Sequence, residues 1–103
     1  MVENKACLRE DDAEKLLDRM AKSVGLRLSK VPETDRRAAH WKFVRYFAGQ
    51  EQTMTLSWFS PQRLLDALLT YKTVLIDCRE IMRNPFYGMT LDELRVHLDL
   101  LDV

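Results

Sequence analysis

Residues 60–85, SPQRLLDALLTYKTVLIDCREIMRNP, decide how the rest of the chain must pack. Read at helical spacing, this stretch has a polar stripe and an apolar stripe on opposite sides. The polar stripe consists of Arg63, Asp66, Thr70, Thr73, Asp77, Glu80 and Asn84, and the apolar stripe of Leu64, Leu68, Tyr71, Leu75, Cys78 and Met82. Ser60 suits an N-cap, Pro61 suits the first helical position, and Pro85 forces a stop. The pattern predicts a long central helix over about 61–83.

Residues 70–76 are rich in Thr, Tyr, Val and Ile, which favour a strand, so a short strand at 73–78 is the alternative. The eight residues 73–80, TVLIDCRE, also resemble the strand-and-turn segment of rhodanese-like domains, where a hydrophobic strand ends in Asp-x-Arg. The catalytic cysteine of that family lies in a later loop, after several strand–helix units that have no counterpart in this sequence. The resemblance therefore implies a strand at 73–78 and carries no activity with it.

Gly49-Gln50 predicts the tight turn of a β-hairpin over about 40–59, because a type II′ turn needs glycine in its first central position. This turn pairs Ala48 with Glu51. Counting outward, one mostly apolar side then holds the pairs Arg45 with Met54, Phe43 with Leu56 and Trp41 with Trp58. The reverse side is mostly polar, as expected for a sheet with one buried face. A helix over 34–48 that ends at Gly49 is the alternative.

Helices are predicted on both sides of the hairpin in the sequence. The first begins at Asp11, where Asp11 and Glu14 form a capping-box pattern, and it ends at Gly25. Residues 26–31 alternate briefly before a proline and predict a short edge strand. A second capping-box pattern begins a C-terminal helix over about 90–101. The chain is therefore predicted to be one α+β domain, residues 1–103, with helices backing a small antiparallel sheet.

The composition is that of an ordinary globular domain, with 47% hydrophobic and 31% charged residues and no net charge. Zero net charge creates no strong field toward nucleic acid or an anionic membrane. No apolar run approaches the length that spans a bilayer, and residues 1–9 lack a signal-peptide core, so we expect a cytoplasmic location without membrane contact. Cys7 and Cys78 have no paired spacing, which argues against a disulfide framework or a zinc knuckle.

The sequence contains no residue set with catalytic or cofactor-binding spacing. Its two histidines, His40 and His97, lie at metal-ligand spacing neither from a cysteine nor from each other. Three glycines cannot build a phosphate-binding loop, and no G-x-S-x-G pattern occurs. We therefore expect a non-enzyme, with no catalytic residue, no metal and no cofactor.

A basic segment leads onto the polar side of the predicted hairpin. Bases that grip phosphates beside an aromatic that stacks on a nucleobase are typical of nucleic-acid binding. The residues that would form such a site are Arg36, Arg37, Lys42, Arg45 and Tyr46. A solvated sheet face that balances the acidic helices explains the same residues, so nucleic-acid binding through residues 36–46 is the alternative function.

Protein–protein contact is the function that the sequence favours. Phe86 and Tyr87 are adjacent aromatics on a tight turn, so one is a candidate partner anchor; otherwise Phe86 plugs a helix–helix corner and Tyr87 lies flat in water. Surplus apolar residues, at Leu65, Leu69, Ile76, Leu98, Leu100, Leu101 and Val103, favour a homodimer or a partner groove; a central helix covered on more sides is the alternative. We expect a small adaptor, inhibitor or regulator, of the kind that phage and mobile elements encode. Its predicted partner-binding residues are Phe86, Tyr87, Arg36, Arg37, Lys42 and Tyr46.

Overall fold

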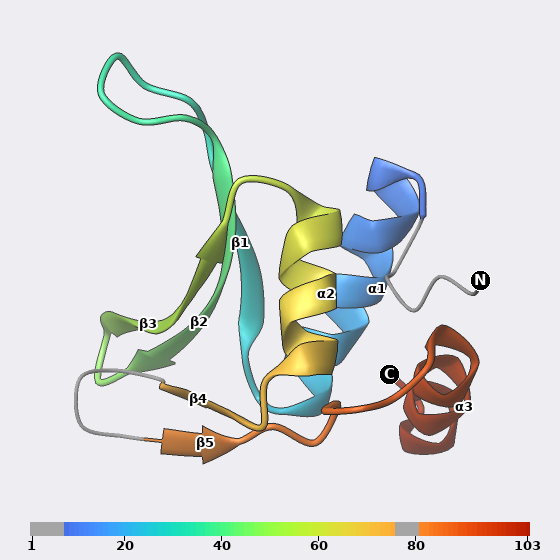
Figure 1. Ribbon diagram of the computed structural model, residues 1–103. Helices are drawn as coiled ribbons and strands as arrows, with labels where there is room; N and C mark the ends of the chain where they lie inside the picture. Colours follow the sequence, from blue (N-terminus) through green and yellow to red (C-terminus); the bar gives the residue numbers. More distant parts are fainter. Residues whose placement is uncertain (1–7, 76–80) are drawn as a thin grey trace.

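The computed structural model describes residues 8–75 and 81–103 and confirms the predicted α+β class (Figure 1). In chain order the elements are α1 (Glu10–Ser23), β1 (Arg27–Val31), β2 (His40–Phe47), β3 (Gln50–Trp58), α2 (Pro61–Thr70), β4 (Thr73–Leu75), β5 (Ile81–Arg83) and α3 (Leu91–Leu101). The predictions for Cys7 and Cys78 fall outside the described residues, as do those for the side chains of Met54 and Leu56.

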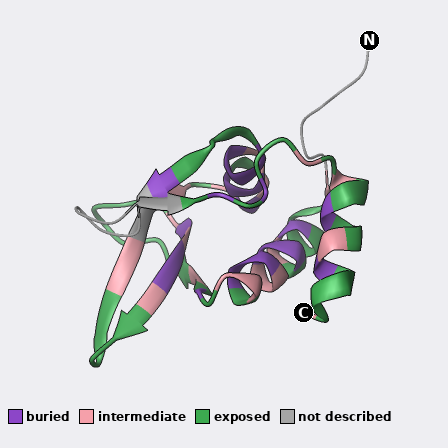
Figure 2. Ribbon diagram, turned by 90° about the horizontal axis from the view of Figure 1, so that it is seen from below, coloured by how far each residue is buried: buried purple, intermediate pink, exposed green. Residues whose placement is uncertain are grey.

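The main sheet is antiparallel with the strand order β1-β2-β3, and α1 and α2 lie together against one of its faces (Figure 1). β1 is an edge strand, as predicted. Burial follows stripes along the helices, while the turn end of the β2–β3 hairpin is exposed (Figure 2). The largest fully buried side chains of the core are Phe43, Phe86, Leu17, Met20, Leu64, Leu65, Leu68, Leu94 and Leu98. No helix in the described part is long and apolar enough to cross a membrane.

α1 is joined to the sheet by a tryptophan. The Trp41 Nε1 donates a hydrogen bond of 2.8 Å to the Glu14 carboxylate, and the indole ring itself is in the core. The predicted capping box of Asp11 and Glu14 is therefore wrong. α1 begins one residue earlier, after an Arg9 N-cap that makes no side-chain hydrogen bond. Because the Glu14 carboxylate accepts the hydrogen bond from Trp41, it does not cap the N-terminus of its own helix.

The predicted long helix over 61–83 is wrong beyond Thr70, where α2 ends. Tyr71 takes an extended conformation, and Thr73–Leu75 forms β4, which pairs antiparallel with Ile81–Arg83. The strand alternative is therefore confirmed over residues 73–75. β-Branched Thr and Val lose side-chain freedom in a helix but fit a pleated strand, so the helical spacing of this segment did not decide its structure.

Asn84 closes the C-terminus of α2. Its buried amide donates hydrogen bonds to the carbonyls of Leu68 and Tyr71, and its side-chain oxygen accepts one from the Phe86 backbone N–H. Gly88 adds a backbone hydrogen bond to another terminal carbonyl of the helix, that of Leu69. Helix ends leave carbonyls without intrahelical partners, and these contacts supply the partners from a segment more than ten residues away.

The β2–β3 hairpin confirms one predicted pair and corrects the turn. Trp41 pairs with Trp58 as expected, but the turn residues are Ala48 and Gly49, closed by Phe47 opposite Gln50. Both turn residues have positive φ, 54° and 79°, which is the pattern of a type I′ turn and not of the predicted II′ turn.

A bulge in β3 accounts for the different strand registers at the two ends of the hairpin. Near the turn, Arg45 pairs with Gln52 instead of the predicted Met54, a displacement of two residues. Between the pairs Val44–Thr53 and Lys42–Ser57, β3 carries two more residues than β2, and this restores the predicted register. Because side chains alternate with a period of two, a shift of two residues leaves Arg45 and Gln52 on the face that the predicted register gave them.

The C-terminal helix starts as predicted. The Thr90 hydroxyl accepts a hydrogen bond from the Glu93 N–H, and the Glu93 carboxylate accepts one from the Thr90 N–H, which completes the capping box. Arg19 of α1 binds both Asp99 and the Val103 carbonyl, and so fastens the end of α3 to α1. Leu94 and Leu98 face the core.

We predict that Asn84→Ala lowers the free energy of unfolding by at least about 2 kcal/mol. The change removes the hydrogen-bond partner of two helix-terminal carbonyls and of one buried N–H. Each unsatisfied buried group costs about 1–3 kcal/mol. Chemical denaturation monitored by circular dichroism measures the effect. Gln50→Ala, at an exposed position, is the control and should change stability by less than about 0.5 kcal/mol. Equal stabilities of the two variants would show that Asn84 does not hold this helix end.

We predict that Ala48→Asn stabilises the protein by roughly 0.5–1 kcal/mol. Ala48 sits at a φ of 54°, where alanine is strained and asparagine is better tolerated, and Asn-Gly is the preferred type I′ pair. Thermal unfolding measures the gain. The opposite control, Gly49→Ala, should destabilise the hairpin, because Gly49 also has a left-handed φ although a Cβ there would meet no neighbour. A lower stability of Ala48→Asn would argue against this turn.

Candidate functional site

The structure separates the predicted basic segment into two parts. Arg36 and Arg37 lie in the exposed β1–β2 loop, where their backbone N–H groups donate to the Thr34 hydroxyl. Lys42 and Tyr46 lie on β2, with Tyr46 near the opposite end of the strand from this loop (Figure 1). Six residues of extended strand span about 20 Å, so these four side chains do not form one compact patch.

Lys42 and Tyr46 converge on Glu51 of β3. The Lys42 Nζ lies 3.2 Å from one carboxylate oxygen of Glu51, and the Tyr46 hydroxyl lies 3.3 Å from the other. The hydrogen bond from Lys42 lowers the pKa of the Glu51 carboxyl, and Tyr46 adds to that effect. The Lys42 charge is therefore already paired, which leaves it poorly suited to hold a phosphate.

The Tyr46 ring also makes a cation–π contact. The Arg27 guanidinium of β1 lies 5.6 Å from the ring centroid, and the ring itself is mostly exposed. The fifth residue of the nucleic-acid alternative, Arg45, donates two hydrogen bonds to the Gln52 side chain. On one side of the sheet, Lys42, Tyr46 and Glu51 thus form a polar network whose side chains bind one another, while Arg45 projects from the other side of β2.

The two predicted aromatic anchors have different environments. Phe86 is fully buried, and its ring lies edge-on to that of His97 with centroids 6.1 Å apart. It plugs the corner beside α3 and is removed from surface contact. Tyr87 is 46% exposed, with the Lys72 ammonium 5.7 Å from its ring centroid. Of the pair, Tyr87 is the accessible aromatic.

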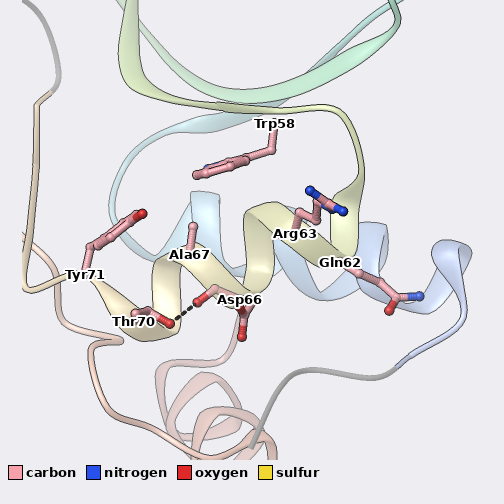
Figure 3. A pocket seen from close by; sticks show the side chains of 7 residues that line it. All are labelled: Trp58, Gln62, Arg63, Asp66, Ala67, Thr70 and Tyr71. Atoms are coloured by element: carbon pink, nitrogen blue, oxygen red, sulfur yellow. Dashed lines mark hydrogen bonds between the residues drawn. The ribbon is translucent and has the colours of Figure 1, made fainter.

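A groove of about 410 Å³ lies between β3 and the outer side of α2 (Figure 3). The side chains that line it are Trp58, Gln62, Arg63, Asp66, Ala67, Thr70 and Tyr71. Trp58 forms one wall with its indole ring above Ala67, while the remaining six residues come from α2 and its C-cap (Figure 3). This volume is at the small end of the range of protein ligand sites.

The α2 side of the groove consists of two adjacent helical stripes. One holds Gln62, Asp66 and Thr70, and the other holds Arg63, Ala67 and the C-cap residue Tyr71, each at four-residue spacing. The Arg63 and Tyr71 side chains extend on the side of α2 that faces Trp58, and Ala67 lies between them under the indole (Figure 3). Ala67 is buried but is not part of the core cluster. The small alanine between two long side chains creates the notch.

The polar groups of the groove differ in how far they are already used. Gln62 donates to the Leu8 carbonyl, and the Thr70 hydroxyl donates to the Asp66 carbonyl at 2.7 Å. Within the described part of the chain, neither Arg63 nor the Asp66 carboxylate forms an ion pair. The groove therefore presents uncommitted charge beside two aromatic rings.

Trp58 differs from its cross-strand partner in its hydrogen bonding. The Trp58 Nε1 is buried, and the described residues provide no acceptor for it, whereas the Trp41 Nε1 is bound to Glu14. A buried N–H without an acceptor costs about 1–3 kcal/mol. The Trp58 ring can therefore change its orientation without breaking a hydrogen bond.

α3 presents a second apolar surface. Val96 is 58% exposed and Leu100 is 82% exposed, one helical turn apart, and both line a shallow hollow with Asp92, Glu93 and His97. Leu65, Leu69 and Leu98, also counted among the surplus apolar residues, are buried in the core. Of the remaining predicted set, Leu100 and Leu101 are exposed on α3, and Ile76 lies outside the described residues.

The groove was not predicted from the sequence. Trp58 was assigned to the core side of the hairpin, and Arg63 and Asp66 to the solvated stripe of a long helix. One feature of the sequence could have indicated the groove. Ala67 is a small residue on the polar side of a helix against which a tryptophan-bearing hairpin is predicted to pack. Among the described residues, no group of three His, Cys, Asp or Glu side chains is placed to hold a metal ion.

Comparison with protein-family models, with curated proteins and with solved structures finds no match to this chain. The local resemblance of residues 73–80 to rhodanese-like domains is accordingly not accompanied by a family match.

We predict that Lys42→Met raises the pKa of Glu51 toward its ordinary value, because it removes the hydrogen bond that contributes most to the lowered value. A lowered folded-state pKa stabilises the fold above the unfolded-state pKa, and this contribution is lost as pH falls through the folded-state pKa. NMR titration of the Glu51 side-chain carboxyl carbon measures the shift. Tyr46→Phe should give a smaller rise. An unchanged Glu51 titration in Lys42→Met would refute the pairing.

Proposed function

We propose that this protein is a small non-enzymatic interaction module that acts in the cytoplasm as an adaptor, inhibitor or regulator, and that the groove between Trp58 and α2 is its partner-binding site. The observation that carries the proposal is the residue set of the groove. Trp, Tyr and Arg are the residue types most enriched at binding hot spots, and Trp58, Tyr71 and Arg63 bring one of each to a single concave site.

Accessibility supports the same site. Tyr71 is 44% exposed and Arg63 is exposed, so both can be covered by a partner. Hot-spot residues bind best where a partner side chain enters a pocket and water is excluded around it. The Ala67 notch between these two side chains provides such a pocket. A flat surface with the same residues would lack it.

The apolar end of α3 supports a second contact, with another copy of the chain or with the same partner. Partner proteins commonly recognise a helix through a row of exposed apolar side chains on one of its faces. Val96 and Leu100 form only a short row, however, and a specific interface usually buries about 800 Å² on each partner. We therefore assign the main contact to the groove and a supporting contact to α3.

Nucleic-acid binding has less support than protein contact. Lys42 is paired with Glu51, and the loop that carries Arg36 and Arg37 also carries Glu33 and Asp35. A loop with two bases and two acids provides little net attraction for phosphates. The exposed Tyr46 and its Arg27 neighbour are the features that keep this alternative open to test.

We predict that Ala67→Phe abolishes capture of the native partner. The phenyl ring replaces a methyl group at the buried position under the Trp58 indole and blocks the notch while the other six groove residues stay. Ala38→Phe places the same substitution in the exposed β1–β2 loop and should leave capture unchanged. Tagged full-length protein is incubated with a lysate of the native host, and the bound proteins are identified by mass spectrometry. Circular dichroism and thermal unfolding confirm that both variants are folded.

Equal capture by Ala67→Phe and the wild-type protein would show that the groove is not the contact site. The nucleic-acid alternative is tested on the same preparations with a single-stranded and a duplex oligonucleotide in a gel-shift assay. A shift that weakens as salt rises and disappears in the Arg36→Ala/Arg37→Ala variant would favour that alternative over protein contact.

A further inference from the structure

The groove has a mixed lining, with four polar side chains and an apolar part formed by Trp58, Ala67 and Tyr71. We call this apolar part the seat: the Trp58 indole lies above Ala67, and the Tyr71 ring lies at one end (Figure 3). Aromatic walls favour a large apolar or aromatic occupant, because offset and edge-on ring contacts add to the gain from burial. A volume of about 410 Å³ accommodates one such side chain with the backbone on either side of it.

The charge that faces this seat is positive. Arg63 extends on the Trp58 side of α2, while the Asp66 carboxylate, although it lines the groove, points away from Trp58 (Figure 3). Arg63 is exposed and forms no ion pair within the described part of the chain. A guanidinium beside an apolar surface is suited to a carboxylate, which it can bind with two parallel hydrogen bonds.

The other polar groups do not change this charge. Gln62 and Thr70 are engaged with the Leu8 and Asp66 carbonyls. A partner that brought a lysine or arginine beside the seat would face the Arg63 guanidinium, and like charges at an interface select against such partners. The chain has no net charge, so this selection comes from the groove and not from a field of the whole molecule.

From these observations we infer the chemistry of the occupant: an acidic peptide segment of a partner protein, with one large apolar side chain seated over Ala67 and a neighbouring Asp or Glu bound to Arg63. The inference rests on the proposed function and adds the partner class to it. The segment contacts Trp58, Ala67 and Tyr71 through the apolar side chain, and those contacts provide most of the affinity. Arg63 adds a preference for acidic segments.

The experiment selects binders from a library of random peptides displayed on phage, with the immobilised full chain as the target. The expected result is enrichment of peptides in which Phe, Tyr, Trp or Leu stands within two positions of Asp or Glu. Selection on Ala67→Phe should not enrich these peptides, and selection on Ala38→Phe should enrich the same ones. No enrichment on the wild-type chain, or enrichment of peptides with basic or uncharged flanks, would overturn the inference.

Arg63 variants separate the partner chemistry from the location of the site. Binding of an enriched peptide is measured by titration calorimetry. Arg63→Ala should weaken it by roughly two- to fivefold, the size of an exposed ion pair, and Arg63→Glu should reverse the preference in favour of a peptide with Lys in place of the acid. Arg36→Glu, an equal charge change in the β1–β2 loop, should leave binding unchanged.

The two proposals fail in different ways. If Ala67→Phe blocks peptides and the native partner but Arg63→Glu leaves the charge preference unchanged, the groove is the binding site and the acidic partner class is wrong. If Ala67→Phe blocks neither, the groove itself is wrong as the site of partner contact. Loss of binding in Ala67→Phe together with a reversed preference in Arg63→Glu supports both.

Discussion

The buried amide of Asn84 fixes where α2 ends, and the remaining architecture depends on that point. Its hydrogen bonds to the carbonyls of Leu68 and Tyr71 terminate the helix after Thr70. The same side chain accepts a hydrogen bond from the Phe86 N–H, and the ring of Phe86 then fills the corner beside α3. One side chain thus sets the end of the central helix and the start of the segment that returns to it. Because helix-terminal carbonyls need partners when buried, this position cannot be replaced by an apolar residue of similar size without cost.

The end of α2 also shapes the groove. Tyr71 is the C-cap residue, and its extended backbone carries the chain away from the helix immediately after the Arg63–Ala67–Tyr71 stripe. A helix that continued to residue 83 would place further side chains along this row, and the site would be an open helical face instead of a notch closed at one end. The groove is therefore a consequence of where the helix stops. Its opposite wall, Trp58, is positioned by the cross-strand pair with Trp41, which the bulge in β3 preserves.

The two sides of the sheet have different potential for contact. On the polar side, Lys42, Tyr46 and Glu51 bind one another, so a partner would have to replace interactions that already exist. In the groove, Arg63 and Asp66 have no ion-pair partner among the described residues, and the Trp58 N–H has no acceptor there. A partner can contact Arg63, Asp66 and Trp58 without breaking an ion pair or hydrogen bond that these side chains form among the described residues. This difference supports the proposed binding site.

Local patterns in the sequence determined the α+β class, the N- and C-terminal helices, the edge strand and the capping box of α3. These depend on apolar periodicity and on caps a few residues long, which act within one element. Tertiary structure decided the rest. Glu14 binds Trp41 and not its own helix terminus, α2 ends because Asn84 is brought to it from a later segment, and the turn moved to Ala48-Gly49 while a bulge restored the register. The groove belongs to the same group, since it exists only where a tryptophan of the hairpin lies over an alanine of the helix. Such contacts join residues whose spacing in the sequence carries no signal, because the distance between them is set by packing and not by the period of a helix or a strand.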